Sequence, residues 1–145
     1  MSCYIIEGGS RLSGEVQISG AKNAVLPILA AAAARKESKI KNIPFLSDVS
    51  NTLRILEKLG MDIKAENNTV TTLNNINSTE LDRDLSRKMR SSVLFLGALL
   101  GKYGEVTIYE PGGCQLGQRP IDIHLWAMEQ LGAEIKQIDE RIICK

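Results

Sequence analysis

The chain has 145 residues, of which 43% are hydrophobic and 24% are charged, a composition typical of a globular domain that can bury a sizeable core. Eighteen Lys and Arg stand against seventeen Asp and Glu, so the formal net charge is +1, and neither sign forms a long run. This balance gives no electrostatic reason to bind nucleic acid or a membrane surface. We therefore expect a small-molecule ligand.

The N-terminal sequence does not have the pattern of a signal peptide, because residues 1–20 lack a basic stretch followed by an apolar core. The longest apolar run, residues 24–34, contains Pro27 and is too short to span a bilayer. These features predict a cytoplasmic chain.

The cysteines show no metal-binding spacing, and their odd number predicts free thiols in a cytoplasmic chain. They are Cys3, Cys114 and Cys144. Cys3 and Cys144 lie in strand-like apolar runs, so we expect both in the core. His124 is the single histidine and has no second histidine with which to bind a metal. The sequence therefore predicts no metal and no cofactor.

The hydrophobic periodicity predicts an α/β chain that opens with a hairpin in residues 1–20. Its strands are expected over residues 3–6 and 15–18, with glycines in the turns between them. After Gly20 the pattern alternates between helix and strand. The expected elements are a helix over 23–35, a strand over 39–43, a helix over 48–59, strands over 62–65 and 69–73, a helix over 86–101 and a strand over 106–109.

The order of elements repeats along the chain. When the sequence is aligned with itself, residues 56–71 match residues 128–143 with five identities, and the apolar face of the first unit's helix falls on that of the second. The positions of that face are Val49, Leu53, Leu56 and Leu59, matched by Ile121, Leu125, Met128 and Leu131. The sequence therefore predicts two copies of one structural unit, each with the same core-facing stripe.

The alignment of the two units contains one insertion. Pro44 matches Pro111 at an offset of 67, whereas Val49 matches Ile121 at an offset of 72, so five residues are added between a strand and a helix of the second unit. The longer connection spans residues 112–120, GGCQLGQRP. Because the first unit makes the same connection without these residues, we expect the insertion to serve function.

The insertion combines a thiol with a cation. Cys114 follows two glycines, which allow close approach of a ligand to the backbone, and Arg119 comes just before the next helix. The alternative is a small buried cysteine, which a glycine-rich insertion matches poorly. Ionised, the thiol would be a nucleophile; protonated, it would be a proton donor, and both roles remain open at this point.

Further candidate ligand groups lie at predicted helix starts. Lys22 and Asn23 follow a strand and a glycine turn, where free amides and the helix dipole favour a phosphate. A solvated lysine and a helix-capping asparagine are the alternative. Arg90 and Asp122 lie near the starts of later helices, where a solvated charge and a favourable dipole partner are the corresponding alternatives.

Four segments together carry a family resemblance: SGAKNAVLPILAA, MRSSVLFLG, PGGCQLGQRPIDIH and EQLGAEI. In this order and at these separations they resemble the enolpyruvyl transferases that act on UDP-N-acetylglucosamine. The cysteine segment is the most specific, since the sister family that acts on shikimate 3-phosphate lacks it. The resemblance implies transfer of enolpyruvyl from phosphoenolpyruvate to the sugar 3-hydroxyl, at the start of peptidoglycan synthesis for cell-wall growth and division.

The resemblance also implies roles for individual residues. Cys114 matches the cysteine that protonates the methylene carbon of phosphoenolpyruvate and is alkylated by fosfomycin. Lys22 and Asn23 match the pair that contacts phosphoenolpyruvate, with the lysine facing its phosphate, and Arg90 matches an arginine of the substrate cleft. Arg119 matches an arginine near both ligands. The run that contacts the nucleotide sugar comprises Arg119, Pro120, Ile121, Asp122 and Ile123.

The fold implied by the resemblance is an inside-out α/β barrel of βαβαββ units, three in each of two domains, with the active site between the domains. Residues 21–145 correspond to two such units, and the hairpin of residues 1–20 corresponds to the other domain. The family's sugar-deprotonating aspartate would lie beyond Lys145, so we expect an inactive fragment of the transferase. The alternative is a non-catalytic ligand-binding or structural remnant. Open strand edges predict self-association.

Overall fold

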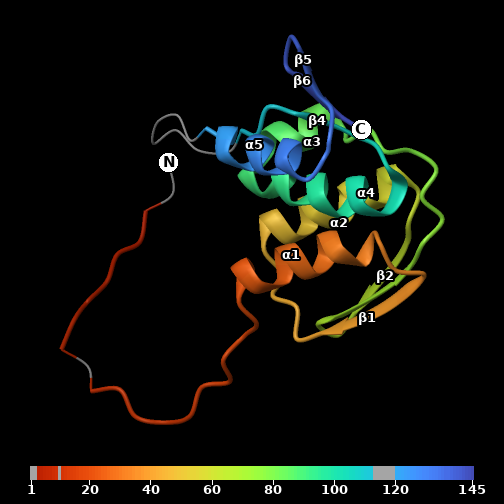
Figure 1. Cartoon of the computed structure of the whole chain (residues 1–145). Helices are drawn as coiled ribbons and strands as arrows, with labels where there is room; N and C mark the ends of the chain where they lie inside the picture. Colours follow the sequence, from red (N-terminus) through yellow and green to blue (C-terminus); the bar gives the residue numbers. More distant parts are fainter. Residues whose placement is uncertain (1–2, 10, 113–119) are drawn as a thin grey trace.

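The computed structural model describes residues 3–9, 11–112 and 120–145 of the chain. Figure 1 shows a layer of helices with one small sheet on each side of it. Helix α1 packs against both α2 and α4. The elements are α1 (Lys22–Ala32), β1 (Glu37–Lys41), α2 (Ser47–Leu59), β2 (Asp62–Glu66), β3 (Thr69–Leu73), α3 (Arg83–Lys88), the 3₁₀ helix η1 (Arg90–Val93), α4 (Leu94–Tyr103), β4 (Val106–Tyr109), α5 (Asp122–Gln130), β5 (Ile135–Ile138) and β6 (Arg141–Cys144).

The two sheets have the same topology, which confirms the predicted repeat. One has the strand order β1-β3-β2 and the other β4-β6-β5, with antiparallel pairing between neighbours in both. A tight turn closes each hairpin with residues at positive φ, Asn67 and Asn68 in the first unit and Asp139 in the second. Asn and Asp tolerate this backbone region better than most residues.

Equivalent hydrogen bonds place the insertion between strand and helix, as the two offsets predict. The Ile43 amide donates to the Asn68 carbonyl at 2.9 Å, and the Glu110 amide donates to the Glu140 carbonyl at 2.9 Å. The donors Ile43 and Glu110 are 67 positions apart, whereas the acceptors Asn68 and Glu140 are 72 positions apart. After the helices, the Met61 and Ala133 amides donate at 3.0 Å to equivalent carbonyls, and both donors and acceptors are related by the larger offset. The five extra residues therefore belong to the β4–α5 connection.

The predicted core-facing stripe is complete only in the first unit. In α2, Val49, Leu56 and Leu59 are fully buried. In the second unit the matching stripe begins with buried Ile121 and Leu125 but ends with Leu131, which is 82% exposed. The prediction of two equal stripes is wrong at this end, because no described residue covers the end of α5.

The helix predicted over residues 86–101 is interrupted. Helix α3 begins earlier, because the Asp82 side chain accepts a hydrogen bond from the Leu85 amide at 2.9 Å and caps it. It ends at Lys88, and the next residue, Met89, is buried and has an extended backbone. The Ser92 hydroxyl lies 3.3 Å from the Ser86 carbonyl oxygen and 3.1 Å from that of Met89, so it can donate to a carbonyl of the last turn of α3.

The hairpin predicted for residues 1–20 is not formed in the described part of that segment. Residues 3–9 and 11–20 contain no strand, and apolar side chains such as Tyr4 and Val16 are exposed. An isolated two-stranded hairpin is marginal in water, and here neither stretch lies on a sheet. In the second unit, the first strand of the βαβαββ pattern is reduced to one parallel bridge, between Glu80 and Thr107. In the first unit, the equivalent strand is not formed among the described residues.

No helix among the described residues is long and apolar enough to cross a membrane.

The repeat supplies a matched pair of glycines for a stability test. Gly60 and Gly132 end equivalent helices at φ 109° and 97°, a backbone region that costs other residues about 1–2 kcal/mol. A Cβ at Gly60 would also lie 2.7 Å from the Asn75 carbonyl oxygen, whereas a Cβ at Gly132 meets nothing within 4 Å. We expect Gly60→Ala to lower the free energy of unfolding by at least about 1 kcal/mol more than Gly132→Ala.

Urea denaturation of both variants checks this. Equal losses would show that the Asn75 backbone moves freely to accept the extra methyl group.

Candidate functional site

The starts of the main helices lie at one end of the helix layer. Figure 1 shows that α1, α2, α4 and α5 all begin on the same side of the molecule. The first turn of a helix has amide groups without helical partners and a partial positive charge. The starts of α1, α2 and α5 therefore favour an anionic ligand on this side, whereas α4 continues directly from η1 and its first amide is already bonded. The candidate residues described by the structure lie at or next to these helix starts.

Lys22 is the first residue of α1 and forms an ion pair with Asp48 in the first turn of α2. Its side chain is about half exposed, at 47%. Asn23 follows it within the helix, and the capping position belongs to Ala21, without a side-chain hydrogen bond. The alternative role of Asn23 as a helix cap is therefore wrong, and its exposed side chain lies in the first turn of α1.

Arg90 begins η1 and contacts the start of α5. Its Nη2 donates to the Pro120 carbonyl oxygen at 3.4 Å. Ile121 is buried and precedes α5, whereas Asp122 and Ile123 in its first turn are exposed. The structure thus brings Arg90 to the run predicted to contact the nucleotide sugar.

Cys114 and Arg119 lie outside the described residues. The other two cysteines differ from each other. Cys144 is buried in the core as predicted, and burial raises the pKa of its thiol. Cys3 is exposed, so its predicted place in the core is wrong, because the segment around it does not join a sheet. Among the described residues, no three His, Cys, Asp or Glu side chains cluster to hold a metal.

A polar cluster lies beside the β4 end of the insertion. Arg83 Nε donates to Glu140 at 2.8 Å and Arg87 Nη1 donates to the same carboxylate at 3.1 Å. The hydrogen bond from Arg83 lowers the pKa of Glu140. With Glu110, Pro111 and Gly112, the residues Arg87 and Glu140 line a cavity of about 140 Å³.

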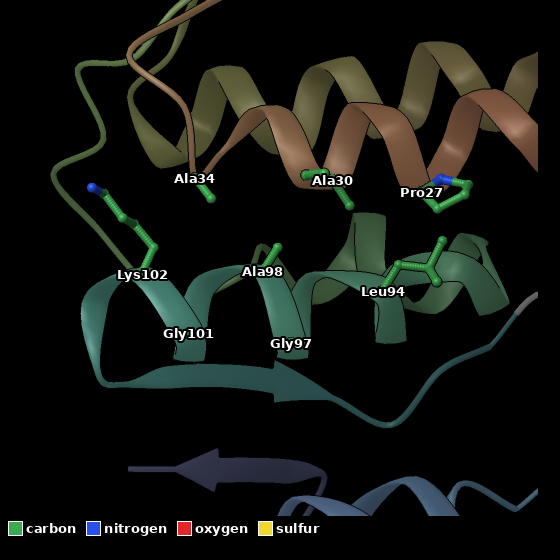
Figure 2. A pocket seen from close by; sticks show the side chains of 9 residues that line it. Pro27, Ala30, Ala34, Leu94, Gly97, Ala98, Gly101 and Lys102 are labelled. Atoms are coloured by element: carbon green, nitrogen blue, oxygen red, sulfur yellow. The ribbon is translucent and has the colours of Figure 1, made fainter.

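A second hollow, of about 390 Å³, lies between α1 and α4. Figure 2 shows that the side chains lining it are mostly small and apolar, with Lys102 at one end. Its residues are Pro27, Ala30, Ala31, Ala34, Leu94, Gly97, Ala98, Gly101 and Lys102. Lys102 is the one charged side chain among these nine residues.

Two contacts in this region were not predicted from the sequence. Asp48 was assigned only to a helix, although an acidic side chain in a first turn is a recognisable signal. Gly112 was noted for backbone freedom, but it packs against the backbone of Arg87, which lies on an earlier helix. No local pattern predicts that contact.

The sequence model of one family, described as EPSP synthase (3-phosphoshikimate 1-carboxyvinyltransferase), matches residues 6–144. The chain belongs to this family. It is 45% identical over 143 residues to a UDP-N-acetylglucosamine 1-carboxyvinyltransferase of Campylobacter hominis, covering 97% of the chain and 34% of the relative. It is 47% identical over 132 residues to one of Nitratiruptor, covering 90% and 31%.

These matches confirm the resemblance to UDP-N-acetylglucosamine carboxyvinyltransferases, and the chain spans about a third of the length of these relatives. The crystal structure of the enolpyruvyl transferase NikO from Streptomyces tendae superposes with a TM-score of 0.79 at 24% identity. That match covers 95% of the chain and 31% of NikO. It confirms the predicted fold, a partial α/β barrel of the enolpyruvyl transferase type.

Proposed function

We propose that the chain supplies ligand-binding and proton-donating residues for transfer of enolpyruvyl from phosphoenolpyruvate to the 3-hydroxyl of UDP-N-acetylglucosamine. This reaction starts peptidoglycan precursor synthesis, and we propose that it takes place in the cytoplasm. The observation that carries the proposal is that two cations begin helices of a family fold, Lys22 at the start of α1 and Arg90 at the start of η1. Both ligands carry phosphates, and helix starts with a neighbouring cation favour such groups.

The proposed reaction is an addition followed by an elimination. The sugar hydroxyl gives its proton to a carboxylate base of the family's active site as its oxygen bonds to C2 of phosphoenolpyruvate, while the Cys114 thiol gives its proton to the methylene carbon and becomes a thiolate. The resulting methyl group then returns a proton to that thiolate as the bond between C2 and the phosphate oxygen breaks. The products are inorganic phosphate and the enolpyruvyl ether, and no cofactor takes part.

The other candidate residues hold the ligands in this proposal. Lys22 and Asn23 contact phosphoenolpyruvate, Arg90 lies in the substrate cleft and Arg119 lies near both ligands. Pro120, Ile121, Asp122 and Ile123 contact the nucleotide sugar. Residues 21–145 form two units of the ligand-binding domain, and in the two-domain enzymes of the family the counterpart of residues 1–20 joins the other domain.

The Lys22–Asp48 ion pair has a consequence for phosphate binding. Lys22 is about half exposed and Asp48 a quarter exposed, so the pair is within reach of solvent. A phosphate that binds Lys22 must therefore compete with the Asp48 carboxylate. Exposed ion pairs contribute only about 0.2–1 kcal/mol, so an arriving dianion can displace this one.

Calorimetric titration of the chain tests the proposal. We expect UDP-N-acetylglucosamine to bind, and Arg119→Ala to weaken that binding about tenfold or more, since a hydrogen bond to a charged group is worth about 1.5–3 kcal/mol. For phosphoenolpyruvate, Lys22→Ala should weaken binding, whereas Asp48→Asn should strengthen it up to about fivefold by freeing the lysine.

A parallel assay for released phosphate separates binding from turnover. We propose that the chain alone binds without turnover, because the family's active site lies between two domains. Clear phosphate release that depends on Cys114 would overturn the claim of inactivity. If neither ligand binds, the ligand-binding role is contradicted, and the chain would have only a structural role.

We also propose self-association through a strand edge. In the second unit, Glu80 lies parallel to Thr107 on the outer edge of β4, whereas among the described residues no strand pairs with the outer edge of β1. Open edges pair readily with extended segments, and residues 11–18 carry exposed Leu12, Val16 and Ile18. The occupant that we propose for this edge is the N-terminal segment of a second copy.

Sedimentation velocity over a wide range of protein concentration tests this association. We expect the mean sedimentation coefficient to rise with concentration, and a chain shortened to begin at Gly20 should stay monomeric. A full chain that is monomeric at every concentration would contradict the proposal.

A further inference from the structure

Both ends of the β4–α5 connection contact the same turn of the chain. At one end, a Cβ added to Gly112 would lie 1.8 Å from the carbonyl oxygen of Arg87 and 2.7 Å from its carbonyl carbon. At the other end, Arg90 Nη2 donates to the Pro120 carbonyl at 3.4 Å. The turn that joins α3 to η1, from Arg87 to Arg90, therefore contacts both the first and the last residue of the connection, Gly112 and Pro120.

The contact at Gly112 requires the absence of a side chain. Its φ lies outside the left-handed region, so the requirement is one of space rather than of backbone conformation. The atoms that it meets are backbone atoms, which cannot rotate away as the end of a flexible side chain can. A methyl group here would have to move either the connection or the Arg87 backbone.

The first unit contains a similar close approach. A Cβ at Gly20 would lie 2.0 Å from the carbonyl oxygen of Asn42, so the chain before α1 packs on the chain after β1. In the second unit the chain before η1 and α4 also packs on the chain after β4, but there the glycine, Gly112, follows the strand and the carbonyl, that of Arg87, precedes the helix. The contact is thus a feature of the scaffold, and the second unit has it at the beginning of the insertion.

Polar contacts hold the Arg87 side of this packing. The Arg83 and Arg87 side chains both donate to the Glu140 carboxylate, and the Glu140 carbonyl accepts from the Glu110 amide at 2.9 Å. The end of β4, helix α3 and the β5–β6 turn are therefore linked to one another. Exposed ion pairs are individually weak, so the close packing at Gly112 is the stronger constraint.

We propose that Gly112 is a positioning residue for the ligand site. Its lack of a side chain lets the connection rest on the Arg87 backbone, and this contact sets the place of Arg90 relative to Pro120 and the start of α5. Gly112 acts through Arg90 and touches no reacting atom. The functional consequence rests on the proposed function, whereas the positioning itself can be measured without a ligand.

Hydrogen exchange of Gly112→Ala tests the positioning. We expect amides of residues 88–94 to exchange about tenfold faster, because overpacking by one methyl group costs about 1–3 kcal/mol. Amides of α2 in the first unit should be unchanged. Gly101→Ala is the control for an added methyl group, since a Cβ there meets nothing within 4 Å, and it should not make residues 88–94 exchange faster.

Unchanged exchange at residues 88–94 in Gly112→Ala would overturn the proposal. Faster exchange throughout the chain, α2 included, would also overturn it, because Gly112 would then stabilise the whole fold instead of one turn.

Calorimetry adds the functional readout. Displacement of the Arg90 turn should weaken UDP-N-acetylglucosamine binding about tenfold or more in Gly112→Ala, since small misplacements of ligand groups are costly. Gly101→Ala should bind as the original chain does. Equal affinity of Gly112→Ala and the original chain would overturn the positioning role. If the original chain itself does not bind, the proposed function fails while the exchange experiment still decides the positioning.

Discussion

The packing of α1 between α2 and α4 is the constraint on which the rest of the structure depends. Leu29 of α1, Leu56 of α2 and Leu99 of α4 are each fully buried, and each such side chain contributes about 1.5–3 kcal/mol when it leaves water. Because these helices begin at the same end of the layer, their packing also gathers their partially positive starts on one side (Figure 1). The interaction that stabilises the fold therefore also places Lys22, at the start of α1, next to Asp48, at the start of α2.

The repeat separates scaffold from insertion without reference to any other protein. Equivalent hydrogen bonds before and after the β4–α5 connection show that its surroundings are built twice, while the connection itself is longer in the second unit. A scaffold that closes without five residues has no structural need of them. The glycines, thiol and arginine of the connection are the residues on which the proposed ligand chemistry rests, and Gly112 also has a packing contact that the local sequence does not reveal.

Much of the fold could be predicted from the sequence, because most of its elements depend on local periodicity. The bounds of β3 and β4 agree with the prediction, and those of α2 differ by one residue at the start. Failures arose where distant contacts decide the outcome. The break after α3 buries Met89, which the local pattern does not indicate. The N-terminal strands need a sheet to pair with, and Leu131 is exposed because no described element covers it. At the site, the sequence predicts Lys22 next to a helix start, where the structure has it, but its Asp48 partner depends on the packing of two helices.

The central claim is that this chain retains the thiol and phosphate-binding environment of a carboxyvinyltransferase. The most direct measurement is mass spectrometry of the chain after incubation with fosfomycin, which carries a phosphonate and alkylates thiols. The other two cysteines are the internal references for this labelling. Cys3 is exposed, whereas Cys144 is buried and its thiol pKa is raised by burial. We predict labelling of Cys114 ahead of both, with a loss of that preference in Lys22→Ala. Equal labelling of Cys114 and Cys3, or no labelling of Cys114, would contradict the claim.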